Sequence, residues 1–432
     1  MKRALLISLS AMGCLASVSA QTLEECQQAA AENYPAIRQL DLIAKTTDLS
    51  VANIAKGWLP QLSASAQATL QSDVTAWPEQ MKTMLAGMGT AVEGLKKDQY
   101  RVGLDVQQVL FDGGSMRRQQ DVARAQGEVQ TAQVETTVYQ IRKRVNEMYF
   151  GLRLTDEQLR LNADLVELLA ANEKKLNTLF EKGTAAESDY LNMKAERLKA
   201  TQQRATLEAQ RRALATMLST FCGIQIGDGD ALRKAAAPEQ PGTAETETAL
   251  CRPELKSFDA QLRLANARER ALDAALMPRI GLFAQGWYGY PGLNMFDDMM
   301  HHRWSLNGIV GARLTWNVGA LYTRRNDKKK IEAQRQMLDA GRETFLLNNR
   351  MEQAEQTERI AHYKTLLADD DEIIDLRTAI RRSAESKLAH GIIDVNDLLR
   401  EINAENAARL GRTVHEIEME KEINDLKYIK GL

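Results

Sequence analysis

The chain has 432 residues, of which 26% are charged and only 5% are aromatic. This composition is typical of long helices rather than of a compact globular core. The 56 basic and 58 acidic residues nearly balance. The balance argues against nucleic acid as a partner, because nucleic-acid-binding domains concentrate positive charge.

Residues 1–20 have the features of a secretory signal peptide. Lys2 and Arg3 precede an apolar stretch at 4–15, and "SVSA" ends in a small-x-small pattern before Gln21. No apolar run of 18 residues follows, so we expect no transmembrane helix. Such an exported chain is either a soluble periplasmic protein or an outer-membrane β-structure.

The remaining sequence is duplicated. The segment 33–62 aligns without gaps to 251–280, and the 25-residue spacing between its two prolines recurs in the second copy. We therefore expect a first repeat over 21–223, a linker over 224–250 and a second repeat over 251–432.

Each repeat is predicted to contain a helix, a strand pair, a long helix and a final helix, which makes the fold class mainly α. Long proline-free tracts rich in Ala, Leu, Glu, Gln, Arg and Lys favour the helices. In the first repeat these elements are predicted at 23–58, about 60–111, 115–182 and 185–221. In the second they are predicted at 252–277, about 279–316, 320–389 and 392–429.

The predicted strands alternate apolar and polar residues. In "LPQLSASAQATLQ" (59–71), leucine and alanine take one face and uncharged polar residues take the other. The runs have about the length that crosses a bilayer at a tilt, and aromatic residues gather near their ends, as in the interfacial girdles of membrane strands. The alternative is one face of a soluble sandwich, but no second sheet is predicted to cover it.

The helix 115–182 contains a seam in steps of four and three residues. Fourteen seam positions lie between Val134 and Phe180, and eleven of them are apolar. A sustained period of 3.5 residues predicts left-handed coiled-coil packing. Because the two shorter helices of each repeat together match the length of its long helix, we expect them to cover it end to end.

No motif in the chain indicates catalysis. The H-E-x-x-H, Walker, nucleophile-elbow and Cys-x-x-Cys patterns are absent. Methionine and histidine in "MFDDMMHHRW" (295–304) are ligand types for copper or zinc, but a polar loop between two strands is the favoured interpretation. We therefore expect no enzyme activity, no cofactor and no metal site.

The order and duplication of several motifs resemble the TolC-like outer-membrane efflux proteins. These motifs are "LEECQQAAAENYPAI", "GWLPQLSASA", "QQVLFDGG" and the two G-x5-D-[YL]-L turns. The resemblance implies a homotrimer in which each chain gives four strands to a 12-stranded β-barrel in outer-membrane lipid. The barrel would continue into a periplasmic α-helical barrel, with the linker in a belt around it.

The same resemblance implies a non-catalytic exit duct in a Gram-negative outer membrane, extending into the periplasm. Its partners would be a periplasmic adaptor and an inner-membrane pump of a tripartite efflux or type I secretion system. Oligomerisation also follows without the resemblance, because four strands are too few to close a barrel and open edges are not tolerated in lipid. The alternative is a periplasmic coiled-coil adaptor or scaffold without a membrane barrel.

The turns at Gly183 and Gly391 are predicted to mark the far tip of the helices. In the resembling family the second-repeat turn carries acidic residues that narrow the entrance, and Asp397 matches the first of them. Arg400 stands at the second acidic position, and Ile393 and Leu388 stand at the family's partner arginine and tyrosine positions, so the familiar closing network is in doubt. Arg400 lies one helical turn from Asp397 and is placed to pair with it. Asp397 and its counterpart Asp189 also suit a helix-start role.

Cys26, Cys222 and Cys251 follow the signal peptide. In this architecture all three are expected near the waist of the helices. An oxidising compartment favours one disulfide, and Cys26–Cys222 is the preferred pair. The alternative is three buried thiols.

Overall fold

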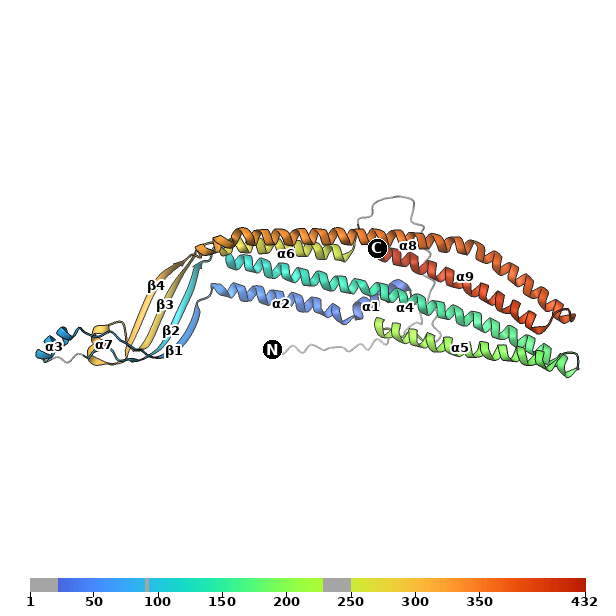
Figure 1. Cartoon of the computed structure of the whole chain (residues 1–432), viewed down its shortest axis with the longest axis horizontal. Coiled ribbons are helices and arrows are strands. Elements are labelled where there is room, and N and C mark those ends of the chain that lie inside the picture. The colour runs from blue at the N-terminus through green and yellow to red at the C-terminus, as the bar shows by residue number, and fades with distance from the viewer. Residues whose placement is uncertain (1–21, 90–92, 228–249) are drawn as a thin grey trace, which may run out of the picture. The chain divides into compact units, whose positions relative to one another are not determined.

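The computed structural model describes residues 22–89, 93–227 and 250–432. The predicted signal peptide and nearly all of the predicted linker lie outside these residues. The first-repeat elements are α1 (Leu23–Asn33), α2 (Arg38–Ala55), β1 (Gln61–Leu70), α3 (Glu79–Gly87), β2 (Asp98–Phe111), α4 (Ser115–Glu181) and α5 (Glu187–Cys222). The second-repeat elements are α6 (Pro253–Ala275), β3 (Arg279–Tyr290), α7 (Met295–His301), β4 (Ser305–Thr315), α8 (Leu321–Ala389) and α9 (Val395–Lys430) (Figure 1).

The structure differs from the sequence prediction in two respects. The single helix expected over 23–58 is interrupted, because α1 ends at Asn33 and a short 3₁₀ turn at Pro35–Ile37 precedes α2. Proline lacks the N–H that a continuous helix needs and forces the preceding residue, Tyr34, into an extended conformation. The connections between paired strands also contain short helices, α3 and α7, which were not predicted.

The chain divides into two compact units that do not coincide with the two repeats. The first unit combines residues up to 39 with 133–256 and 342–432, and the second combines 40–132 with 257–341. Each unit therefore contains parts of both repeats, and α4 and α8 each contribute to both units.

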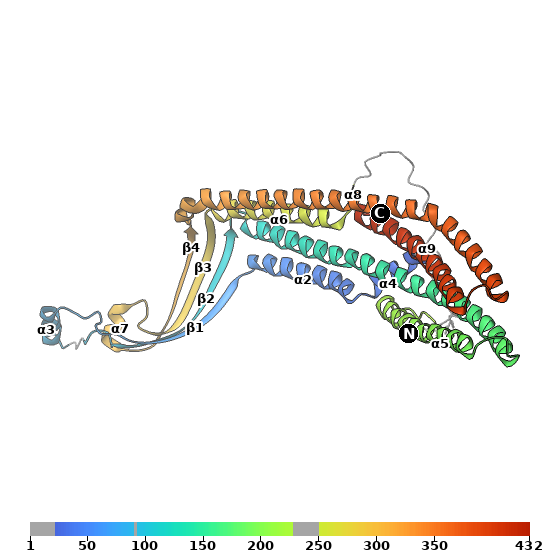
Figure 2. The ribbon, with the colours of Figure 1, turned by 45° about the vertical axis from the view of Figure 1, so that its right-hand side comes forward.

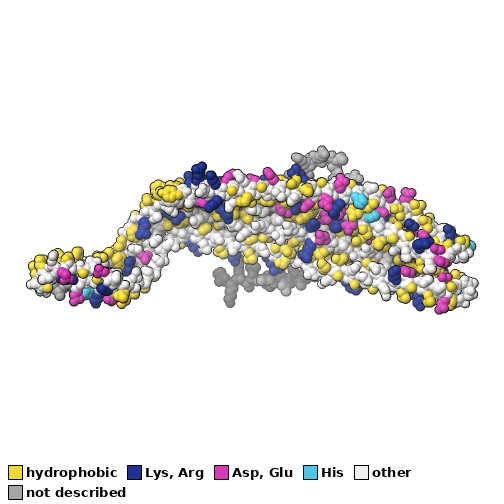
Figure 3. Space-filling view, in the orientation of Figure 1, with side chains coloured by type: hydrophobic (Ala, Val, Ile, Leu, Met, Phe, Trp, Pro, Cys, Tyr) yellow, Lys and Arg dark blue, Asp and Glu magenta, His cyan; other side chains and the backbone are white. Residues whose placement is uncertain are grey.

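The second unit contains one antiparallel sheet of order β1-β2-β3-β4. Its register aligns the predicted apolar positions on one face: Ala66 is opposite Val102, which is opposite Tyr288, which is opposite Leu306. Leu110 is the exception, because a bulge between Val109 and Phe111 places Phe111 opposite Ile280. Leu62, Leu306 and Val310 are at least 71% exposed on this face. Figure 3 shows hydrophobic side chains over the strands and over the α3–α7 end of this unit. The apolar face is thus continuous and uncovered in one chain.

One end of the sheet carries a cluster of aromatic rings. Trp304 stacks on Tyr100 with 6.1 Å between ring centroids and lies 5.4 Å from the ring of Tyr288. Beyond them the two strand connections pack together, because Trp77 contacts Phe296 and Met299 is buried beside Leu95. The aromatic end predicted from the sequence is therefore formed by three strands.

The helices of the second unit approach closely through small side chains. A buried cluster joins α4 and α6 and consists mostly of alanine: Ala125, Val129, Ala132, Ala260, Leu264 and Ala267. Gly127 leaves room for Thr47 of α2 against α4. Small residues at these positions let the helix axes come near one another.

The first unit is a helical bundle built on the predicted seam. Val145, Leu152 and Leu169 of α4 are at most 2% exposed, so the coiled-coil side of α4 is confirmed as its buried side. One core joins α1, α4 and α5, and another lies at the turn end between the α4–α5 and α8–α9 hairpins. Figure 2 shows both hairpins turning at the same end of this unit.

A chain of polar side chains centred on the buried Asn146 joins three helices of the first unit. Gln27 of α1 donates to Asn146 Oδ1 of α4 (2.6 Å), and Asn146 Nδ2 donates to Asp425 Oδ1 of α9 (2.9 Å). Burial raises the pKa of Asp425, and the hydrogen bond from Asn146 opposes that rise. Because buried polar groups must be paired, this chain fixes the level at which the helices meet.

Candidate functional site

The two predicted tip turns have the same backbone construction. Gly183 has φ +73° and Gly391 has φ +70°, a region that favours glycine because it carries no Cβ. In the first turn Thr184 N donates to Leu179 O and Gly183 N to Phe180 O. In the second Ile392 N donates to Lys387 O and Gly391 N to Leu388 O. Both are Schellman motifs, which satisfy the last carbonyls of α4 and α8.

The helices that follow the two turns begin differently. The side chain of Asp394 caps α9 by accepting a hydrogen bond from Asp397 N (2.8 Å). Ala186 stands at the corresponding position of α5 and makes no side-chain cap. Asp189 and Asp397 both lie in the first turn of their helix, where a carboxylate complements the helix dipole. Only the second-repeat turn has a capping residue that locks its backbone.

Asp397 and Arg400 form the ion pair that their spacing predicts. Arg400 Nη2 lies 2.9 Å from Asp397 Oδ1, and the side chains are 72% and 41% exposed, respectively. An exposed pair of this kind contributes at most about 1 kcal/mol. The carboxylate therefore keeps access to solvent, and its charge is partly offset by an exposed arginine.

Ile393 and Leu388 lie in the apolar core of the tip. Both pack against the buried cluster that includes Val395, Leu398 and Met193. Tyr190, next to Asp189, packs against the same cluster and stacks on Phe180 at 6.5 Å between centroids. The two positions that are polar in the resembling family thus serve packing in this chain.

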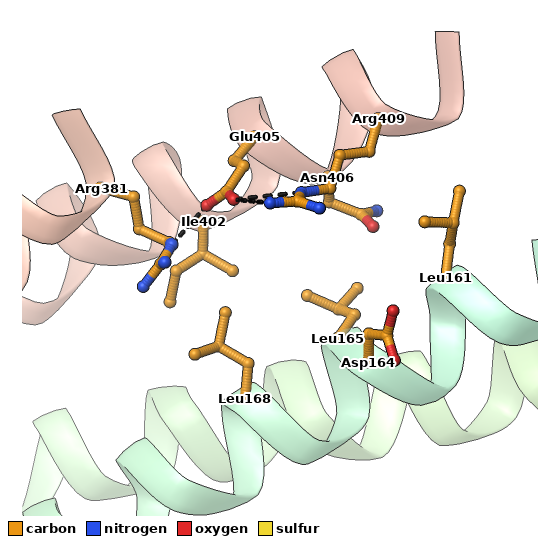
Figure 4. Close-up of a pocket in the computed structure, with 9 residues that line it drawn as sticks. All are labelled: Leu161, Asp164, Leu165, Leu168, Arg381, Ile402, Glu405, Asn406 and Arg409. Atoms are coloured by element: carbon orange, nitrogen blue, oxygen red, sulfur yellow. Dashed lines mark hydrogen bonds and ion pairs between the residues drawn. The ribbon is translucent and has the colours of Figure 1, made fainter. Parts of the chain in front are cut away.

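A cavity of about 220 Å³ lies behind the tip between α4 and α9 (Figure 4). One wall is apolar, with Leu165 and Leu168 of α4 facing Ile402 of α9. The other wall is an ion-pair cluster in which Glu405 lies between Arg381 and Arg409. Asp164 stands at the rim on the α4 side.

Glu405 is the centre of this ion-pair cluster and is only 5% exposed. It accepts hydrogen bonds from Arg409 (2.7 Å), from Thr378 Oγ1 (2.8 Å) and from Arg381. Burial acts to raise the pKa of Glu405, but these three donors outweigh it and hold the pKa below the ordinary value of 4.5. The ionised carboxylate of Glu405 therefore holds α8 against α9, an interaction called here the Glu405 clamp.

Replacing Glu405 with alanine is expected to loosen the α8–α9 hairpin. Removing one partner of a buried pair costs about 3 kcal/mol, the low end of the usual range, because Glu385 still pairs with Arg381. Hydrogen exchange over residues 378–409 should accelerate. Since the folded-state pKa is lowered, the stabilisation is present above pH 4.5 and is lost as pH falls through that lower pKa. The wild-type advantage should therefore shrink in acid.

Glu401 provides the matched control on the same helix. Its contacts to Arg377 and Arg400 are 3.6 and 3.7 Å long, so Glu401→Ala should change exchange little. Equal exchange in the two variants would contradict the clamp.

Sequence reasoning missed this ion-pair cluster. The sequence contains two i,i+4 pairs of opposite charge, Arg381 with Glu385 and Glu405 with Arg409. Such pairs are common on exposed helix faces, so they do not indicate a buried cluster. Nothing in the spacing shows that the two pairs meet across the hairpin.

The structure places Cys26 and Cys222 side by side in the core of the first unit. Cys222 Sγ lies 3.4 Å from the carbonyl oxygen of Cys26, and both side chains are buried thiols. The hydrogen bond with Cys222, together with burial, raises the pKa of Cys26. The Cys26–Cys222 disulfide stays a prediction, and mapping of unreduced peptides by mass spectrometry would decide it. Cys251 is exposed.

The polar side chains of the 295–304 segment are engaged with one another and with backbone. Asp297 pairs with His301 Nδ1 (2.8 Å) and with Arg303 (2.9 Å), while His302 Nε2 lies 2.7 Å from Gly94 O. Among the described residues, no group of three or more His, Cys, Asp or Glu side chains is arranged to hold a metal ion.

Within the described ranges, no helix has both the length and the apolar character needed to cross a membrane.

Comparison with known families and structures gives a consistent result. Residues 26–223 match the family model described as outer membrane efflux protein, which confirms the resemblance seen in the sequence. No curated protein matches the chain in sequence.

Solved outer-membrane channels share the fold over 95% of the chain. VceC from Vibrio cholerae is 14% identical with a TM-score of 0.64, and 96% of that chain is covered. CmeC from Campylobacter jejuni is 15% identical with a TM-score of 0.63 and 85% covered. MtrE from Neisseria gonorrhoeae, solved in an open state, is 17% identical with a TM-score of 0.64 and 88% covered.

Proposed function

Because residues 26–223 match the model of the outer membrane efflux protein family, we propose that the chain forms a trimeric exit duct in the outer membrane of a Gram-negative bacterium. The duct passes substrates from the periplasm, or from an inner-membrane pump, to the exterior. The observation that carries this proposal is the sheet, whose exposed apolar face is continuous across all four strands. Such a face suits contact with lipid.

The number of strands supports the trimer. The order β1-β2-β3-β4 makes β1 and β4 edge strands, and an open strand edge is very costly in hydrocarbon because its backbone groups lack partners. Four strands are too few to close, whereas three copies supply twelve, an even number within the range of outer-membrane barrels. Pairing β1 of one copy with β4 of the next removes every edge.

The long helices of each chain are proposed to extend into the periplasm. There the turns at Gly183 and Gly391 face the inner-membrane side, where a periplasmic adaptor and an inner-membrane pump engage the duct in tripartite efflux or type I secretion. Asp397 and Arg400 are proposed to line the constriction at this end, and no catalytic step or cofactor is proposed. Within each chain of the trimer, the two sequence repeats are proposed to occupy equivalent positions.

The test combines mass and conductance. The full chain, extracted from outer membranes in detergent, should have a protein mass three times that of one mature chain, shift its mobility on heating and form pores in planar bilayers. A protein that is monomeric, stable without detergent and inactive in bilayers would instead identify a periplasmic scaffold and contradict the proposal.

A further inference from the structure

The face of the sheet opposite the apolar one, here called the polar face, carries an unusual set of side chains. On β1 it is uncharged and consists of serine, threonine and glutamine. On β2, β3 and β4 it includes arginines and two aromatic rings. Its charged and aromatic members are Arg101, Asp105, Arg279, Phe283, Trp287 and Arg313.

Two of the arginines lie over aromatic rings. Arg101 Cζ is 4.3 Å from the ring centroid of Trp287, and Arg313 Cζ is 4.7 Å from that of Phe283. These are cation–π distances. Both rings come from β3, while the arginines come from the strands on either side of it, so the two pairs occupy neighbouring parts of one surface.

A glycine lies directly opposite each ring. Gly103 faces Trp287 and Gly311 faces Phe283 in the strand register. A Cβ on Gly103 would approach Trp287 Cβ to 3.0 Å, and one on Gly311 would approach the Phe283 ring to 2.8 Å. A larger residue at Gly311 would displace the Phe283 ring, and one at Gly103 would press on the base of the Trp287 side chain, so both glycines leave room for the rings beside them.

The charge of the polar face is not balanced. Within the described strands it carries three arginines, at 101, 279 and 313, against one carboxylate, Asp105, which leaves two net positive charges per chain. Among the described residues none of the three arginines is within an ion pair, and Asp105 Oδ1 accepts no hydrogen bond. In the part of the chain that the structure describes, the excess positive charge of this face is therefore not offset by a paired carboxylate.

We propose that the polar face forms an anion-favouring segment of the duct, in which Arg101 and Arg313 bind the acidic group of organic anions that also carry an aromatic or apolar body. This inference rests on the proposed function, because only a closed trimer turns the polar face into a lumen. Three copies would place six net positive charges around it.

Physical chemistry supports both parts of this assignment. Charges of one sign on the low-dielectric wall of a pore raise the local concentration of the opposite ion. A guanidinium that stacks on a ring keeps its N–H groups free for two parallel hydrogen bonds to a carboxylate or sulfonate. Trp287 is only 7% exposed and supports Arg101 from below. The half-buried ring of Phe283 supplies apolar contact for the rest of the molecule, which an inorganic anion cannot use.

The experiment uses the full-length trimer in planar bilayers. Under a KCl gradient, Arg101→Gln with Arg313→Gln should shift the reversal potential toward that of potassium, and Asp105→Asn should shift it toward that of chloride. 2-Naphthalenesulfonate, added to the compartment that corresponds to the cell exterior, should block wild-type pores more strongly than methanesulfonate. Its half-blocking concentration should rise about tenfold in the double arginine variant, the equivalent of about 1.4 kcal/mol.

Arg263→Gln is the matched control. Arg263 lies on α6, is paired with Glu128 and is 58% exposed, so its loss should leave both readings unchanged. Wild-type pores whose selectivity and block do not respond to the double variant would overturn the inference while leaving the duct intact. Equal block by the two sulfonates would overturn the organic-anion assignment. A wild-type chain that forms no pores would refute the proposed function itself.

Discussion

Replacing Ala284 with arginine is expected to abolish assembly in the outer membrane. Ala284 lies mid-strand in β3, opposite Val106 and Val310, on the exposed apolar face. An arginine on the lipid face near the bilayer centre costs about 2–4 kcal/mol. Three copies would raise the cost to about 6–12 kcal/mol, comparable to the whole stability of an ordinary domain. The measurement is the amount of heat-modifiable trimer in purified outer membranes.

The neighbouring position provides the control for this substitution. Gln285 points to the polar face, opposite Asp105, so Gln285→Arg introduces the same side chain one residue away beside a carboxylate. It should assemble normally. Trimer from both variants in equal amount would show that neither face meets lipid, and loss of both would point to damage to the strand rather than to membrane exposure.

Asp397→Ala is expected to lower the cation selectivity of the duct and its block by divalent cations, whereas Arg400→Ala should strengthen both. Three Asp397 carboxylates around a narrow axis would concentrate negative charge, and a constriction of that kind favours cations. Arg400, 2.9 Å from Asp397, offsets part of that charge. Its removal exposes the carboxylate fully. The measurement is reversal potential and magnesium block in planar bilayers.

Asp189→Ala tests whether the effect of Asp397 comes from a ring of charge at the constriction or from its place at the start of a helix. Asp189 occupies the same place in its helix as Asp397 but follows a turn without a side-chain cap. We expect its substitution to leave selectivity unchanged. If Asp397→Ala and Arg400→Ala also leave selectivity and block unchanged, Asp397 acts only at the start of α9.

The sheet shows why some of the fold was predictable. Period-two alternation assigns each strand residue to a face without knowledge of its neighbours, and the observed register aligns those faces across all four strands. The seam of α4 was predictable for the same reason, because its period is local. The break at Pro35 could also have been predicted, because proline lacks the N–H that a continuous helix needs, but the sequence analysis expected one helix over 23–58.

Other features depend on contacts between distant segments. The cluster around Glu405 requires Thr378 and Arg381 of α8 to meet α9 in one particular helix register, which no local pattern specifies. The stacking of Arg101 on Trp287 depends likewise on the pairing of β2 with β3. The glycines of the turns were found because the G-x5-D-[YL]-L motif occurs once in each repeat. The packing of Ile393 and Leu388 into the tip core was not found.

The two compact units also escaped prediction. Sequence duplication suggested a division between 223 and 251, but each unit draws on both repeats. The reason is that every amphipathic helix must bury its apolar stripe against another element. Helices of one repeat can bury their apolar stripes against helices of the other. The boundary between the sequence repeats is therefore not the boundary between the compact units.

The aromatic residues at the ends of β4 imply a preference for bilayer thickness. Trp304 and Trp316 flank the strand and are 12 residues apart, which is about 41 Å along an extended chain. A tilt of about 40° reduces this to about 31 Å along the membrane normal. The rings would sit at the two interfaces of a bilayer of about average hydrocarbon thickness, roughly 30 Å, whereas a thinner or thicker bilayer would displace them at a small cost for each ångström of mismatch. The spacing of the two tryptophans would then favour regions of membrane with that thickness, so lipid composition would help to set where the duct accumulates.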